Sequence, residues 1–277
     1  MRSLYEASRL ALFVLALCPA VSPDAAAAKL KPETVTAWET YVRLTEKRID
    51  SELDSPGGFL RTDRVRPAEA QAIRTAIRNG QTYIQKLSTM NDDGSAVRVP
   101  DGLIHHWFGS IFVPKVGLDS LLTWIQNYDQ HHQYFKEVEQ SKLLSKEGDT
   151  FKVFLRFVRK KVVTVHYNTN HTAIYRHHLG GQESSRSFTT RIAEVENAGS
   201  ASEKEKPVGD DSGFLWRLNS YWRFKEQDGG VVIECESISL SRSIPFGLGW
   251  LIKRFVESVP QESMENTLLS IRDSIAW

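Results

Sequence analysis

The sequence predicts an α+β fold in which a curved antiparallel sheet wraps around a long C-terminal helix. Residues 81–242 contain successive segments in which apolar and polar side chains alternate, as in half-buried strands. The C-terminal residues instead repeat apolar side chains at helical spacing, and two further helical patterns precede the strands. We therefore expect a signal peptide over residues 1–28, an N-terminal helical extension over 29–80 and the sheet-and-helix domain over 81–277.

The composition is that of a globular protein with a sizeable core. Of the 277 residues, 41% are hydrophobic and 25% are charged, which is ordinary for a folded domain. The 35 Lys and Arg residues nearly balance the 34 Asp and Glu residues. Because nucleic-acid binding needs a basic excess, we expect no nucleic-acid partner.

The first residues have the layout of a secretory signal peptide. Arg2 and Arg9 precede an apolar run over residues 10–21, and a stretch of alanines ends at Ala28. This layout predicts cleavage near Ala28 and export to the periplasm or the outside of the cell. A lipoprotein signal ending at Cys18 and an uncleaved anchor are the alternatives, although the run is shorter than the ~20 residues that span a bilayer.

Residues 29–80 predict two amphipathic helices. The first covers residues 33–54, with side chains near helical spacing at Trp38, Tyr41, Val42, Thr45, Ile49 and Leu53. The second begins at Pro67, which a first helical turn tolerates, and ends before Gly80. Neither helix can bury its apolar stripe alone, so both need a partner surface.

After Gln81 the period becomes that of strands, with one helical interruption. Residues 117–138 predict an amphipathic helix and a short second one. Around them we expect strands over residues 82–89, 94–100, 102–114, 151–158, 162–169, 172–178 and 187–196. Residues 197–213 exceed an ordinary hairpin loop, which predicts either a mobile flap that serves as a gate or a disordered excursion.

The segment GFLWRLNSYWRF, residues 213–224, predicts a strand with a large aromatic face. Its even positions share one face: Phe214, Trp216, Leu218, Ser220, Trp222 and Phe224. A two-residue turn at Asp228-Gly229 or at Gly229-Gly230 joins this strand to residues 231–242.

Either turn brings the polar faces of these two strands together. Arg223 then lies beside Glu234 and Glu236, which favours a polar ladder on the surface. The alternative is a buried network in which Glu236 and Arg242 lie under the N-terminal helices. Cys235, on the aromatic side, is expected to be buried as a small hydrophobic residue. It is the one cysteine left after cleavage, so no intrachain disulfide is expected.

The last residues predict the long helix. Apolar side chains recur at helical spacing: Leu248, Leu251, Ile252, Phe255, Val256 and Val259. Pro260 should kink or interrupt this helix, after which the stripe resumes with Met264, Leu268, Ile271 and Ile275.

This order of elements resembles that of the START-like superfamily, also called SRPBCC or helix-grip proteins. Two passages carry the likeness, NYDQHHQYFKEVEQSKLL (residues 127–144) and CESISLSRSIPFGLGWLIKRFV (residues 235–256), and it extends from Leu103 to Ser274. Within the superfamily the chain is most similar to a group of exported bacterial proteins whose activity is not assigned. The resemblance implies a curved antiparallel sheet around the long helix, with a cavity between them.

Large apolar side chains would form the wall of such a cavity: Trp216, Leu218, Trp222, Phe224, Phe157, Leu251, Ile252 and Phe255. We therefore expect an exported protein that binds a hydrophobic small molecule, such as a lipid, without transforming it. The alternatives are an enzyme of polyketide-cyclase or hydrolase type, using a polar group at the cavity mouth, and a structural domain with a filled core. Lys253 and Arg254 beside Trp250 also allow contact with a membrane surface, and the oligomeric state stays open.

The histidines and serines follow no catalytic or metal-binding pattern, so we assign no catalytic residue, metal or cofactor. Adjacent histidines in a strand point to opposite faces, and the cysteine ligands usual in a structural zinc site are missing. A site assembled from two strands, for example His106 with His166, stays open. Ser237, Ser239 and Ser241 share a strand face but lack a nucleophile elbow.

Overall fold

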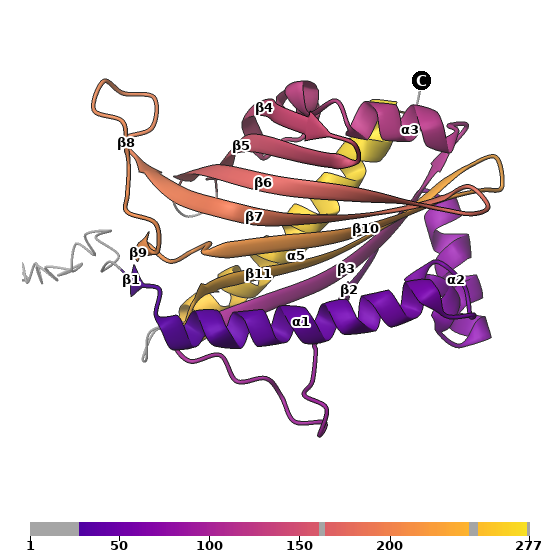
Figure 1. Cartoon of the computed structure of the whole chain (residues 1–277), viewed down its shortest axis with the longest axis horizontal. Coiled ribbons are helices and arrows are strands. Elements are labelled where there is room, and N and C mark those ends of the chain that lie inside the picture. The colour runs from indigo at the N-terminus through magenta and orange to yellow at the C-terminus, as the bar shows by residue number, and fades with distance from the viewer. Residues whose placement is uncertain (1–27, 161–163, 244–248, 276–277) are drawn as a thin grey trace, which may run out of the picture.

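The computed structural model describes residues 28–160, 164–243 and 249–275, and the side chains of all of these but residues 249–257. It contains a large antiparallel sheet with helices on both faces (Figure 1). Apart from Ala28, the expected signal peptide lies outside the described residues. Within the described ranges, no helix combines the length and the apolar character needed to cross a bilayer.

The large sheet has the strand order β2-β3-β11-β10-β7-β6-β5-β4, with β8 paired to β7. Its strands are β2 (Tyr83–Lys86), β3 (Gly102–Pro114), β4 (Val138–Glu147), β5 (Thr150–Lys160), β6 (Thr164–His178), β7 (Gln182–Glu196), β8 (Lys204–Glu205), β10 (Arg217–Gln227) and β11 (Gly230–Arg242). Two short strands, β1 (Ala28–Lys29) and β9 (Asp210–Asp211), pair with each other. The strand expected over residues 94–100 does not form, because the chain closes a turn there and adds only an isolated bridge between Met90 and Ala96.

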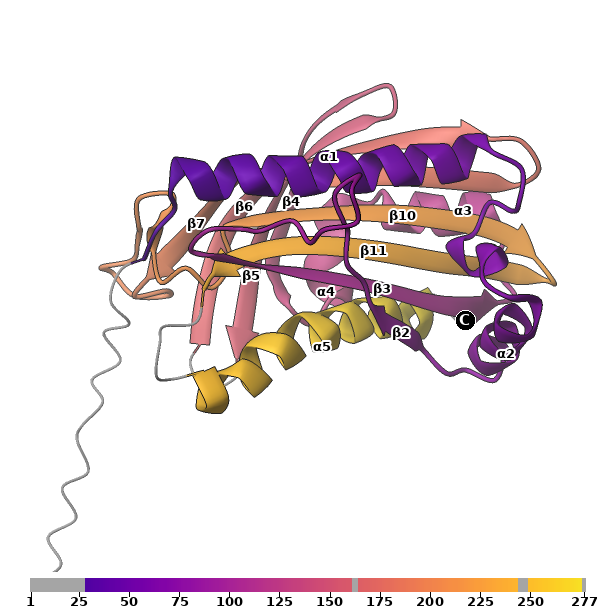
Figure 2. The ribbon, with the colours of Figure 1, turned by 90° about the horizontal axis from the view of Figure 1, so that it is seen from below.

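The helices are α1 (Pro32–Asp54), α2 (Pro67–Arg78), α3 (Leu118–Ile125), α4 (His131–Tyr134) and α5 (Gly249–Ile275). Two short 3-10 helices, Arg61–Arg64 and Tyr128–Gln130, precede α2 and α4. We call the sheet face covered by α1 the outer face and the one crossed by α5 the inner face (Figure 2). The helix α5 continues through Pro260 without interruption.

The predicted helix-grip fold is confirmed. The chain runs through β3, α3, α4, β4, β5, β6, β7, β10 and β11 to the long helix α5, which is the order expected of a START-like fold. The inner core joins Phe224 and Ile233 of the sheet to Leu268 of α5. The helix approaches closely at Gly109, where an added Cβ would lie 2.5 Å from Leu268 Cδ1. A separate core on the outer face includes Trp38 of α1.

Candidate functional site

The inner face of the sheet divides into a filled half and a half-buried half. In the filled half, side chains such as Val153, Tyr175 and Phe224 are buried under α3 and the C-terminal part of α5. Side chains on the same face are only half-buried farther along the strands: Leu155, Phe157, Ser187, Thr189, Leu218, Ser220, Trp222 and Ser237. The strand registers place them in neighbouring rows. We call this set the inner patch, and it combines large apolar side chains with hydroxyl groups.

Three of the predicted wall residues, Phe157, Leu218 and Trp222, belong to the inner patch. Phe224 lies on the same face but is 1% exposed in the filled half. Its ring is parallel to that of Trp222, with the ring centroids 6.1 Å apart. The side chains of the three predicted wall residues on α5 lie outside the described residues: Leu251, Ile252 and Phe255.

The prediction for Trp216 is wrong. Its side chain is buried on the outer face in the same core as Ile238, and its Nε1 donates to Asp211 Oδ1 at 3.1 Å. The alternation fails because β10 begins only at Arg217 and the residues before it form bends. Phe214, which the same alternation places on the inner side, is 43% exposed.

The inner patch surrounds a buried histidine that the sequence analysis did not single out. His171 pairs with Val153 on β5 and Thr189 on β7, so its side chain points to the inner face. The ring meets that of Phe157 edge-on, with centroids 5.8 Å apart, and its Nε2 lies 2.8 Å from Thr169 Oγ1. Burial lowers the pKa of His171 to about 4, so the ring is neutral near pH 7.

A signal for this position is present in the sequence. His171 stands in strand phase with Ala173 and Tyr175, and both of these are buried in the inner core. A residue two positions from a core residue on the same strand shares its face. His171 therefore belongs to the inner face by the alternation of its own strand.

The polar side of the last hairpin is buried, so the expected surface ladder is wrong. Glu234, Glu236 and Arg223 are each 5% exposed or less beneath the N-terminal helices. The alternative, a buried network, is confirmed for Glu236. Arg242 is half-buried, and its guanidinium lies over the ring of Phe214, 5.7 Å from the ring centroid.

This buried network ties α1 to the sheet. Glu236 Oε1 lies 2.7 Å from His106 Nε2 and also accepts a hydrogen bond from Arg48 of α1. The other ring nitrogen of His106 lies 2.8 Å from the Tyr41 hydroxyl. Burial would raise the pKa of Glu236, but the hydrogen bond from His106 and the charge of Arg48 outweigh it and lower the pKa to about 2. His106 is thus held between Glu236 and Tyr41, while His166 binds Glu139 on another part of the sheet.

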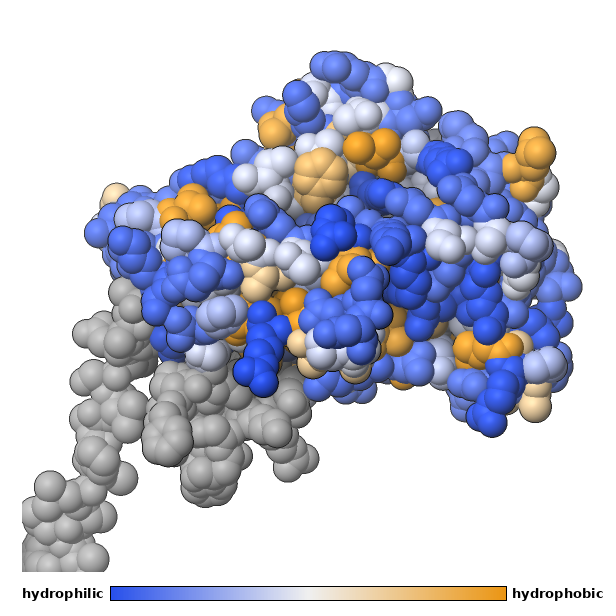
Figure 3. Space-filling model, turned by 60° about the horizontal axis from the view of Figure 1, so that its bottom comes forward, coloured by the Kyte–Doolittle hydropathy of each residue, from blue (hydrophilic) through white to orange (hydrophobic). Residues whose placement is uncertain are grey.

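Four polar side chains therefore meet between α1 and the sheet, which is a structural arrangement rather than an accessible site: Tyr41, Arg48, His106 and Glu236. On the side of the molecule that carries α1, apolar side chains lie in small separate patches among polar ones (Figure 3).

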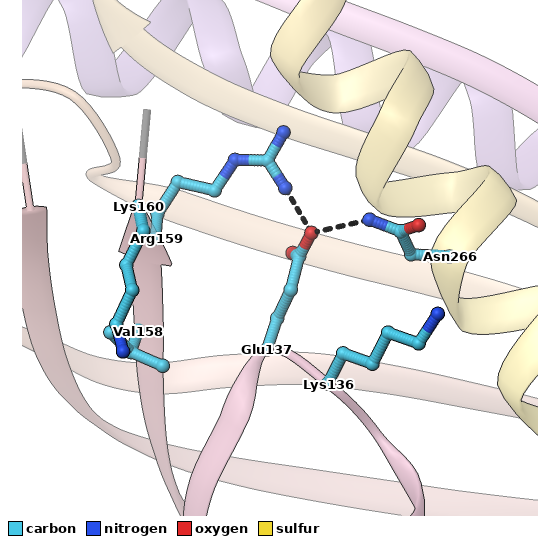
Figure 4. A pocket seen from close by; sticks show the side chains of 6 residues that line it. All are labelled: Lys136, Glu137, Val158, Arg159, Lys160 and Asn266. Carbon is cyan, nitrogen blue, oxygen red and sulfur yellow. Dashed lines mark hydrogen bonds and ion pairs between the residues drawn. The ribbon is translucent and has the colours of Figure 1, made fainter. Parts of the chain in front are cut away.

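A charged hollow of about 210 Å³ lies where the ends of β4 and β5 meet α5 (Figure 4). Its lining residues are Lys136, Glu137, Val158, Arg159, Lys160 and Asn266. Glu137 accepts hydrogen bonds from Arg159, from Ser263 Oγ at 2.7 Å and from Asn266 Nδ2 at 3.1 Å. We call this set of bonds the Glu137 clasp, because it fastens the middle of α5 to the sheet next to Phe157.

The long segment 197–213 forms strand pairs with the rest of the chain, so a disordered excursion is the wrong interpretation. Its strand β8 pairs with β7, and β9 pairs with β1. The Glu203 carboxylate accepts hydrogen bonds from both terminal nitrogens of Arg156, at 3.0 and 2.8 Å. A gating role for this segment stays a prediction.

No family model matches the chain, and no curated protein matches it. Solved structures that are similar include a STAR-related lipid transfer protein fragment from Xanthomonas axonopodis, 16% identical, with a TM-score of 0.44 over 65% of this chain and 96% of that one. Human StAR-related lipid transfer protein 5 is 9% identical, with a TM-score of 0.43 over 87% and 97% of the two chains. The Zhui aromatase/cyclase from Streptomyces sp. R1128 is 10% identical, with a TM-score of 0.40 over 62% and 93%.

Proposed function

We propose that the chain binds a hydrophobic small molecule, such as a lipid-like ligand, between the inner patch and α5. The observation that carries this proposal is that Phe157, Leu218 and Trp222 remain half-buried on one continuous surface, while the neighbouring half of the same face is filled. A ligand that covers these side chains gains about 25 cal/mol for each Å² of apolar surface removed from water. Ordering the ligand takes back part of that gain.

The polar members of the patch fit this proposal. Ser187, Ser220 and Ser237 lie in one row across β7, β10 and β11. Ligand sites are usually lined mainly by apolar side chains, with a few polar groups that fix the ligand's orientation. The patch has this mixture.

His171 supports binding more than catalysis. A general base is most effective when its pKa lies near the working pH, whereas the pKa of His171 is lowered to about 4 by burial. A ring that is this weakly basic is better suited to hydrogen bonding than to proton abstraction at neutral pH. We therefore favour a binding protein over an enzyme of cyclase or hydrolase type.

We also propose that the protein acts outside the cytoplasm and that the start of α5 contacts a membrane surface. The first proposal rests on the signal-peptide pattern of residues 1–28, and the second on Trp250, Lys253 and Arg254. N-terminal sequencing of the protein isolated from the cell envelope tests export, because a chain that still begins at Met1 would contradict it.

The ligand proposal is tested by native mass spectrometry and by titration with Nile red, a fluorophore that brightens in apolar sites. Leu218→Glu places a charge in the inner patch, and Phe188→Glu places the same charge on the outer face of the adjacent strand, where Phe188 is 37% exposed. We expect Leu218→Glu to weaken Nile red binding at least about tenfold, because burying an unpaired carboxylate is costly. The Phe188→Glu control should bind within about twofold of the unsubstituted protein. Equal effects of the two substitutions, or no binding at all, would contradict the proposal.

A further inference from the structure

We propose that the ligand of the inner patch carries a hydroxyl group that donates a hydrogen bond to Nδ1 of His171. This inference rests on the proposed function, because it needs a ligand on the patch. It adds the chemical class of that ligand, which is an apolar alcohol.

The hydrogen bonds around Thr169 determine which nitrogen of His171 carries the proton. Thr169 Oγ1 donates to the carbonyl oxygen of Leu155 at 2.8 Å. A hydroxyl has a single proton to donate, so the contact of 2.8 Å between Thr169 Oγ1 and His171 Nε2 needs its proton from the histidine. The neutral ring is therefore protonated at Nε2, and Nδ1 holds a free lone pair.

This lone pair is an acceptor without a donor. Among the described residues, His171 makes its hydrogen bond through Nε2 and none is found at Nδ1. The residue is 7% exposed, so the ring has little contact with solvent that could supply a donor. A donor on a ligand would satisfy this acceptor.

The surroundings of His171 select a neutral donor. A carboxylate ligand would place acceptor oxygens against the Nδ1 lone pair. An ammonium ligand would lose its hydration beside Phe157 and Leu218, which lie next to His171 and its strand partner Thr189. Burial keeps the pKa of His171 at about 4, so the ring does not become a cation that attracts anions at neutral pH. A hydroxyl group on an apolar body meets these conditions.

The test compares two probes, 1-dodecanol and its methyl ether. Both can accept a hydrogen bond, but only the alcohol can donate one. Each probe displaces Nile red from the full chain. We expect the alcohol to bind about tenfold more tightly than the ether, the difference typical of one buried hydrogen bond. In His171→Phe, which keeps an aromatic ring but has no acceptor, the two probes should bind equally. In His171→Asn, whose side-chain oxygen can replace Nδ1, the preference for the alcohol should return in part.

The outcomes separate this inference from the proposed function. If both probes bind the unsubstituted protein equally well, the inference is wrong and the hydrophobic site stands. If His171→Phe folds and keeps the preference, the hydroxyl is bound elsewhere and the inference is also wrong. If neither probe displaces Nile red and no ligand binds, the proposed function fails and the inference fails with it. The comparison in the unsubstituted protein needs no variant, so it decides the matter even if His171→Phe does not fold.

Discussion

Replacing Glu236 by Gln is expected to destabilise the fold strongly at neutral pH and less in acid. The carboxylate lies under α1, where it accepts hydrogen bonds from Arg48 and His106. Glutamine keeps the size of the side chain and removes its charge. The guanidinium of Arg48 then loses a buried counter-charge, which is the costly way to break an ion pair.

The size of the effect follows from the lowered pKa. The pKa of Glu236 falls from 4.5 to about 2 in the fold, and each pKa unit is worth about 1.4 kcal/mol. The charged form therefore stabilises the fold by about 3 kcal/mol. Its side chain is 5% exposed, so water screens the interaction little. Because the pKa is lower in the folded state, this stability is complete above pH 4.5 and is lost as the pH falls towards 2.

The assay is urea unfolding followed by circular dichroism at pH 7 and at pH 3. The free energy of unfolding of Glu236→Gln should lie about 3 kcal/mol below that of the unsubstituted protein at pH 7, and roughly 1.5 kcal/mol below it at pH 3. Glu147→Gln is the matched control, because Glu147 is exposed at the end of β4. It should change the free energy of unfolding by less than about 0.5 kcal/mol.

Two results would refute this reasoning. One is a difference in the free energy of unfolding below about 1 kcal/mol at pH 7. It would mean that the buried ion pair stabilises the fold no more than an exposed ion pair does. The other is an equal difference at pH 7 and pH 3, which would mean that the effect comes from altered packing rather than from charge.

Three further predictions concern other parts of the fold. Gly109→Ala should lower the free energy of unfolding by about 1–3 kcal/mol, because the new Cβ would lie 2.5 Å from Leu268 Cδ1; a loss under about 0.5 kcal/mol would show that α5 can shift away. Burial raises the pKa of the Cys235 thiol, so a thiol reagent should label it only as fast as the protein opens, and rapid labelling of native protein would contradict this. Glu137→Ala removes the Glu137 clasp and should speed amide hydrogen exchange in α5 around Asn266 but not in α1; unchanged exchange there would mean that the clasp does not hold the helix.

Periodicity and turn chemistry predicted the elements that depend on local signals. The helices α1 and α2 begin within a residue of their predicted starts, each with a proline in its first turn. The last hairpin uses the first of the two expected turns, because Gln227 pairs with Gly230. Asp228 and Gly229 both have positive φ, 58° and 74°, as a two-residue turn of this kind needs.

The side chains that the sequence misplaced depend on contacts between distant residues. Alternation shows that Arg223 and Glu236 share a face with their strand partners, but it does not show that α1 covers that face. Alternation also does not show where a strand begins. Trp216 precedes the first residue of β10, Arg217, so the alternation of the strand does not apply to it. Strand phase places His171 on the inner face, but its contact with Phe157 depends on the pairing of β5 with β6.

The strands β10 and β11 are held on their two sides by forces that respond to different conditions. Ionised groups join them to α1 in addition to an apolar core, whereas apolar side chains join them to α5. Acid protonates the carboxylates and so weakens the ion pairs, whereas cooling weakens the apolar contacts. Acid should therefore loosen α1 before α5, whereas cooling should weaken the apolar contacts of both helices.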